Sequence, residues 1–171
     1  MAKKSKANKT EHYTLLKAIY VVFLGLIIAL FVGLGIAAFY EQPKEPEAPE
    51  ILMSSNIGKE PTAEVRQAEI DYQKSIKDFN ENKRGPYYRN VAIIDIIAAV
   101  LILTIGLVFS LKFMLISDGI LLGGVFTLIY SVICAAQANN IRFTFIMVAV
   151  ALVVTLGLGF WKFLRKPKAK K

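Results

Sequence analysis

The sequence predicts an all-helical integral membrane protein: a bundle of four transmembrane helices with one amphipathic helix in its first external loop. The first observation is four apolar stretches, each about 20 residues or longer, in a chain of 171 residues. At 1.5 Å of rise per residue, about 20 helical residues cross a hydrocarbon core about 30 Å thick. The second is that these stretches contain no lysine or arginine and only two acids, Asp95 and Asp118. The third is that lysines gather at both ends of the chain.

The expected segments follow the apolar stretches and the charges between them. They are a basic cytoplasmic tail at 1–14, a first span at 15–40, an external loop at 41–90 with a helix at about 63–84, spans at 91–111, 113–136 and 141–163, and a basic tail at 164–171. The lysine-rich first tail is expected to be disordered. Short connections between the last three spans predict antiparallel neighbours.

The charges orient the spans. Eleven of the 21 basic residues lie before the first span, at its start, at the end of the fourth span or after it, whereas the loop at 41–90 holds eight basic and ten acidic residues. Because lysine and arginine resist translocation, both termini are predicted to be cytoplasmic and the long loop external. Lys83, Arg84 and Arg89, at the outer end of the second span, oppose this orientation but are outweighed by the two tails.

The expected location is the plasma membrane, with an organelle membrane as the alternative. The net charge of +8 also raises the question of nucleic acid. The lysines adjoin apolar spans, however, where anionic lipid head groups attract each of them by about 1 kcal/mol. Lipid head groups are therefore the expected partners of both tails, and nucleic acid is not.

The first span is expected to be an uncleaved anchor. Its apolar run is longer than the 7 to 15 residues usual in a signal peptide, and no clear cleavage site follows it. Cleavage would leave three spans with the C-terminus still inside. Cys134, the only cysteine, lies in the third span, so no disulfide, cysteine metal site or cofactor is expected.

Within the first loop, a proline-rich stretch at 42–50 is typical of an extended spacer, and an irregular connector is expected at 51–60. The helix at 63–84 carries a narrow apolar stripe with spacings of three and four residues. Its members are Val65, Ala68, Tyr72, Ile76 and Phe79. Gly85 and Pro86 are expected to end this helix, and the tyrosine pair at 87–88 to lie in the aromatic belt of the membrane interface.

Small residues recur every four positions in three of the spans. Because lipid is as apolar as leucine, membrane helices gain from close backbone contact, which small residues permit. The predicted packing positions are Gly25, Ala29, Gly33, Gly119, Gly123, Thr127, Ala151, Thr155 and Gly159. Packing within one chain is the favoured interpretation, and self-association into a homo-oligomer is the alternative.

Asp95 is predicted to point into the bundle, because its helical face also carries small residues. An ionisable group inside a membrane suggests function by default, since its burial costs a few kcal/mol or more. Arg142, at a similar depth in the fourth span, is the expected ion-pair partner that orients the two helices. The alternatives are that Asp95 handles a proton or cation, or that it reaches the surface.

Asp118 lies near the inner end of the third span, where Lys17, Lys112 or Lys162 could reach it. The two acids are therefore predicted near opposite membrane faces, about 15 Å apart in depth. They cannot share a proton, and no ionisable residue connects them in a relay.

No enzymatic activity is expected. His12 is the only histidine, and no glycine-rich phosphate loop or spacing of nucleophile and base occurs. In outline, the four-span plan resembles claudin-like and tetraspanin-like proteins, but their loop cysteines are absent here. Small multidrug exporters also have four spans, but they depend on a carboxylate in the first span, and residues 18–40 contain none.

Two functions remain. The first is an accessory or interaction subunit that presents the external helix, whose apolar stripe must bury against the bundle, the lipid interface or a partner protein. The second is a small oligomeric transporter or channel with Asp95 as its ion-sensitive residue. Four helices in one chain leave little room for a pore, so this second function would need a homo-oligomer.

Overall fold

The computed structural model describes residues 2–53, 62–110 and 112–164, and these residues form helices and connections without a strand. The elements are α1 (Ala2–Phe39), α2 (Glu50–Met53), α3 (Ala63–Phe79), η1 (Asn80–Arg84), α4 (Gly85–Phe109), α5 (Met114–Gln137), α6 (Ile141–Gly159) and η2 (Phe160–Leu164). Four of the helices in these ranges are long and apolar enough to cross a membrane. The predicted all-helical class with four apolar helices is confirmed.

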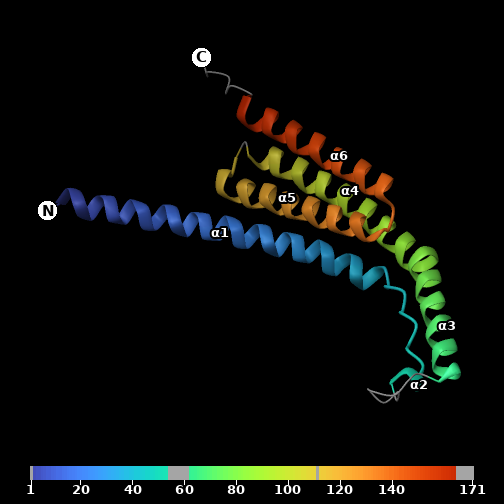
Figure 1. Ribbon diagram of the computed structural model, residues 1–171. Coiled ribbons are helices and arrows are strands. Elements are labelled where there is room, and N and C mark those ends of the chain that lie inside the picture. The colour runs from blue at the N-terminus through green and yellow to red at the C-terminus, as the bar shows by residue number, and fades with distance from the viewer. Residues whose placement is uncertain (1, 54–61, 111, 165–171) are drawn as a thin grey trace.

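The helix α5 lies at the centre of the packing. It contacts α1 on one side, α4 on the other, and α6, which also contacts α4 (Figure 1). The buried core follows the α4–α5 interface and includes Ala99, Leu103 and Leu128. Among the described side chains, Gly25 is the buried residue of α1 and Met147 that of α6. The helices α1 and α6 therefore leave most of their apolar surface uncovered by the rest of the protein, where lipid can cover it.

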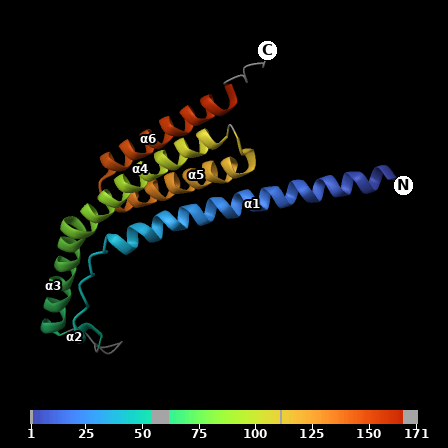
Figure 2. The same cartoon turned by 180° about the vertical axis from the view of Figure 1, so that it is seen from behind.

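The helix α1 begins at Ala2 and extends past the ends of α5 and α4 (Figure 2). The expectation of a disordered tail at 1–14 is therefore wrong. No proline or glycine occurs before Gly25, and lysine and alanine are good helix formers. Once the apolar span has formed the helix, nothing in the tail sequence interrupts its propagation.

The expected stop at Gly85 and Pro86 is also wrong, because the helix continues from α3 through η1 into α4. The five residues of η1 form a π-helix, in which the Gly85 N–H binds the carbonyl oxygen of Asn80. The chain bends between α3 and α4 (Figure 1). Proline removes a backbone donor and crowds the preceding turn, and a widened turn accommodates both effects as a bend rather than an end.

Gly85 also allows a close approach between two parts of the fold. A Cβ atom at this position would lie 3.1 Å from the carbonyl oxygen of Ala138, in the connection between α5 and α6. The connection between α5 and α6 therefore rests against the bend itself.

The first loop runs back along α3. Residues 41–49 are non-helical, as expected for the proline-rich stretch, and α2 forms a single short turn after them. The expected irregular connector at 51–60 is thus helical at 51–53, and its remaining part, Gly58 included, lies outside the described residues. The loop and α3 lie side by side in both views, with α2 in contact with α3 (Figures 1 and 2).

Candidate functional site

Asp95 lies in the third turn of α4 and is fully buried, at 0% exposure. Neither of its carboxylate oxygens has a hydrogen-bond partner among the residues that the structure describes. Its neighbours on the buried face of α4 include Ala92 and Ala99, and it lies within electrostatic range of Tyr130 and Cys134 on α5. The side chain thus points into the bundle and not toward the surface.

The structure does not bring Asp95 and Arg142 into an ion pair, so the predicted pairing is wrong. Arg142 is exposed in the first turn of α6. The face of α6 that packs on the core carries Phe143 and Met147. Arg142 lies five residues from Met147, about 140° around the helix, and therefore faces away from Asp95.

Other polar side chains near the α4–α5 interface are satisfied by backbone carbonyls. The Ser131 hydroxyl donates to the carbonyl oxygen of Ala92 at 2.8 Å, and the Ser117 hydroxyl donates to that of Gly106 at 2.7 Å. These bonds tie α5 to α4 at two depths. Asp95 is thus an exception within this interface, and an ionised carboxylate in its place would lack any compensating donor.

Asp118 has the opposite surroundings. The Lys162 ammonium lies 2.6 Å from Oδ1 of Asp118, and each side chain is about one-third exposed. Lys162 is one of the three lysines that the sequence placed within reach, and the pair ties η2 to the first turns of α5. Lys17 lies nearby, because it lines a hollow together with Asp118 and Met114.

Asp118 lies near the beginning of α5, and Asp95 lies ten residues after the beginning of α4, which runs antiparallel to α5 (Figure 1). The two acids therefore lie in opposite halves of the bundle. Among the described residues, no group of three histidine, cysteine or acidic side chains is placed to hold a metal ion.

The small-residue positions divide into packed and open ones. A Cβ on Gly25 would lie 3.1 Å from the backbone nitrogen of Gly123, and a Cβ on Gly119 would lie 2.6 Å from the side chain of Leu24. These glycines let α1 approach α5 closely. Ala29 is half-buried on the same helix, and Thr127 is buried, with its hydroxyl bonded to the carbonyl oxygen of Gly123.

The remaining predicted small-residue positions on α1 and α6 are mostly not packed against another helix. A Cβ on Gly33 or Gly159 would meet nothing within 4 Å, and Thr155 is exposed. Only Ala151 of the α6 stripe packs against the core. The prediction of packing within the chain therefore fails at Gly33, Thr155 and Gly159, because α1 and α6 each touch the bundle along only part of their length.

Two packing glycines were absent from the predicted stripes. Gly106 receives the side chain of Leu121, and Gly124 receives that of Leu103, so each helix of the α4–α5 pair places a leucine on a glycine of the other. Neither glycine continues a spacing of four within a predicted stripe. The sequence does indicate that a glycine lies on the same face of α4 as Asp95. This pattern identified the buried face of α4, but not the residue of α5 that the glycine contacts.

A set of aromatic contacts joins the end of α1 to the beginning of α4. The rings of Tyr40 and Tyr87 stack with centroids 5.1 Å apart, and Tyr88 meets Tyr87 edge-on. The Asn90 amide donates to the Tyr40 hydroxyl at 2.9 Å, and the Gln42 amide donates to the Tyr88 hydroxyl at 3.2 Å. We call these five residues the tyrosine junction. The sequence placed two of its tyrosines at the membrane interface but not their partners.

Beyond this junction, the loop and α3 form a projection that we call the arm, residues 41–53 and 63–79. The five predicted stripe residues are the residues of α3 that are at least half-buried, and the remainder of α3 is exposed. In the loop, Pro43, Pro46 and Pro49 are half-buried. Their spacing of three matches the three residues per turn of a polyproline helix, so they share one side of the segment.

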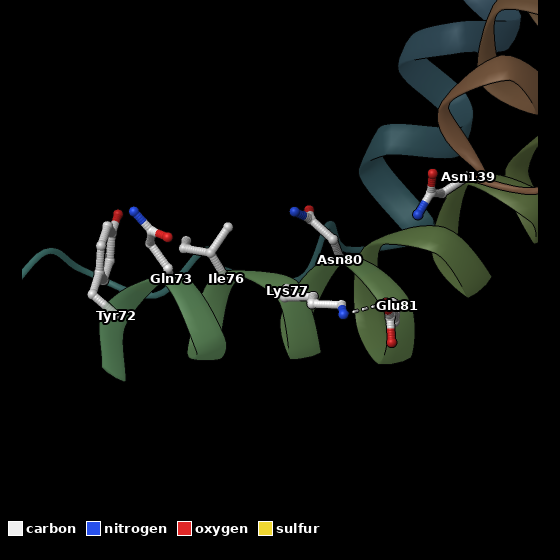
Figure 3. A pocket seen from close by; sticks show the side chains of 7 residues that line it. All are labelled: Tyr72, Gln73, Ile76, Lys77, Asn80, Glu81 and Asn139. Carbon is white, nitrogen blue, oxygen red and sulfur yellow. Dashed lines mark ion pairs between the residues drawn. The ribbon is translucent and has the colours of Figure 1, made fainter. Parts of the chain in front are cut away.

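The stripe is only partly covered, because Tyr72 and Ile76 line an open groove of about 430 Å³. The groove lies where α3 meets the connection between α5 and α6, which contributes Asn139 (Figure 3). Its position at the bend was not predictable from α3 alone, because Asn139, one of its seven lining residues, comes from a connection about 60 residues later in the chain.

Comparisons with known proteins add no relative. No protein-family model matches the chain, and neither does any of the curated proteins or solved structures compared with it. The arm, the groove and Asp95 are therefore the features that bear on the function of this protein.

Proposed function

We propose that the chain is a non-enzymatic interaction subunit of a membrane complex, anchored by four helices and recognising a partner protein through its arm on the external side. The observation that carries this proposal is the arm itself. It departs from the bundle at an angle and is tied to α1 and α4 by the tyrosine junction (Figure 1). A fixed projection presents a constant surface, which lowers the ordering cost of binding.

The partner is expected to meet the exposed side of the arm or the open part of its stripe. Ile70 is a large apolar residue of α3 with 59% exposure, although α3 is otherwise rich in charge. The loop already lies along the helix, so the arm does not need the lipid interface to bury its stripe.

Photocrosslinking in native membranes tests this function. A photoreactive amino acid placed at Ile70 is expected to capture one defined second protein, and the same residue placed at Val153 on the exposed side of α6 is expected to capture lipid. Products at Ile70 confined to lipid or to the chain itself would remove the proposal.

A second candidate is a small homo-oligomeric transporter or channel, and the observation that favours it is the buried, unpartnered carboxylate of Asp95. Keeping such a group charged inside a membrane costs free energy. Binding and release of a proton or cation would explain why the protein retains it. Ion flux into liposomes reconstituted with the wild type and Asp95→Asn tests it. An absence of flux, or equal flux in both proteins, removes the transporter, and Asp118→Asn provides a control for a partnered acid.

A further inference from the structure

The groove at the bend has a distinct lining, which Figure 3 shows in detail. Tyr72, Gln73, Ile76 and Asn80 project from α3 and η1 toward the same side, and Asn139 enters from the connection between α5 and α6. The lining combines two apolar side chains with three amides. A second hollow of about 240 Å³ continues past Asn80 and Asn139 toward Arg84.

The spacing of these residues defines a linear site. Tyr72, Ile76 and Asn80 lie four residues apart, so they follow one face of the helix over about 12 Å. An extended polypeptide rises about 3.3 Å per residue, so this face matches about four residues of an extended chain.

The amides supply hydrogen-bonding groups suited to a peptide backbone. A side-chain amide both donates and accepts, as a peptide group does. The Oδ1 atom of Asn80 is buried and has no hydrogen-bond partner among the described residues, and the Asn80 side chain lines the groove. Asn139 has a φ of 51°, and its exposed side chain lies beyond Asn80 at the end of the groove (Figure 3).

The charges of the groove favour a neutral ligand. Its charged residues are Lys77 and Glu81, whose side chains lie 4.0 Å apart and neutralise each other. Arg84, in the adjoining hollow, lies over the ring of Tyr88 at 5.8 Å. An anionic lipid head group would therefore find no uncommitted cation in the main groove.

From this geometry we propose that the groove binds an uncharged, extended segment of a partner polypeptide. The amides of Asn80 and Asn139 pair with its backbone, and an apolar side chain of the segment contacts Tyr72 and Ile76. This inference rests on the proposed interaction function and deepens it, because it assigns the docking site and the chemistry of the bound segment.

Two photocrosslinking positions test the site in the full-length protein in native membranes. Gln73 lies in the groove, and Lys74 is exposed about 100° further around α3. A photoreactive residue at Gln73 is expected to give an adduct with a partner polypeptide that maps to one uncharged segment. The adduct is expected to fall about tenfold in Asn80→Ala, because one hydrogen bond between the amide and the bound segment is lost.

The matched control is Asn82→Ala, which removes another amide of the same π-helix. Asn82 is exposed and bonds to Asp78 instead of lining the groove. In the Asn82→Ala variant, the adduct formed from position Gln73 is therefore expected to stay at the wild-type level. Adducts at Lys74 but none at Gln73 would contradict the proposal that the groove is the docking site, but would leave the interaction function intact. A lipid adduct at Gln73, or an equal loss of the adduct in Asn80→Ala and Asn82→Ala, would also contradict the proposal that the groove is the docking site. No protein adduct at Gln73, Lys74 or Ile70 would overturn both proposals.

Discussion

Two aspartates of this chain have the same side chain and different surroundings. Asp118 holds the Lys162 ammonium at a partly exposed end of the bundle, where an ion pair contributes about 0–1 kcal/mol. Asp95 is enclosed by α4 and α5, and its carboxylate has no hydrogen-bond partner among the residues that the structure describes. Because nothing in the enclosure compensates its desolvation, Asp95 lowers the stability of the bundle.

Replacing Asp95 with leucine, which has the same number of side-chain heavy atoms, tests this claim. The free energy of unfolding in detergent is expected to rise by about 1–3 kcal/mol, because an unsatisfied polar group is removed from the core. Asp118→Leu is the comparison, and it is expected to lower the free energy of unfolding slightly, since Lys162 loses its partner. A fall for Asp95→Leu at least as large as that for Asp118→Leu would contradict the structural argument.

Gly123 makes a similarly local prediction. A Cβ there would lie 2.8 Å from Cβ of Ile28 and 3.2 Å from the carbonyl oxygen of Gly25. Gly123→Val is therefore expected to separate α1 from α5 and to lower the free energy of unfolding by about 1–3 kcal/mol. Gly33→Val is the control, because the added side chain meets open space. Equal thermal unfolding midpoints in detergent for the two variants would show that the close approach has no energetic weight.

Among the elements, the continuous helix from Ala63 to Phe109 decides the shape of the protein. Its π-helical segment sets the bend, and Gly85 lets the connection between α5 and α6 rest there. The tyrosine junction supplies the remaining restraint by tying the end of α1 to the beginning of α4. The arm is held by its base and not by contacts along the bundle.

Removing the stacked ring at the base is expected to free the arm. Tyr40→Ala loses the stack on Tyr87 and the hydrogen bond from Asn90. Distances measured by pulsed electron resonance between spin labels at Ser75 and Val153 are expected to broaden in this variant. Tyr13→Ala, which removes an exposed ring of α1 outside the junction, should leave the distribution narrow. Equal widths in the two variants would mean that the junction does not restrain the arm.

At the scale of the whole molecule, the four apolar helices and the distribution of charge determine how the chain crosses a membrane. Antiparallel α4 and α5 place their acids in opposite halves of the bundle, and the arm projects from the end opposite to the start of α1 (Figure 1). In our proposal all four helices cross the membrane, and an even number of crossings places both termini on one side. The positive charge of the tails makes that side the cytoplasmic one in our proposal.

Labelling with a membrane-impermeant maleimide tests this orientation. Cys134 is buried, so the wild type is expected to give little background. Ser75→Cys on the arm should be labelled in intact cells, whereas Lys168→Cys in the C-terminal tail should be labelled only after the membrane is opened. Labelling of Lys168→Cys in intact cells would show that the C-terminus is external and would contradict the proposed orientation.

Much of this architecture was predictable from short-range sequence patterns. The four apolar helices follow from the length of apolar runs, and the stripe of α3 follows from spacings of three and four residues, because both patterns are read within one helix. The inward direction of Asp95 was likewise predictable from the small residues that share its helical face.

Contacts between helices were not predictable in this way. Arg142 and Asp95 lie at similar depth, but the rotation of α6 separates them, and rotation is set by how side chains interlock. The same reason explains why Gly123 is packed while Gly33 is open, and why Pro86 accompanies a bend rather than an end. The amino-acid sequence by itself determines that four helices are long and apolar enough to cross a membrane. Only the tertiary structure decides which faces meet, and hence where the arm, the groove and the unpaired carboxylate lie.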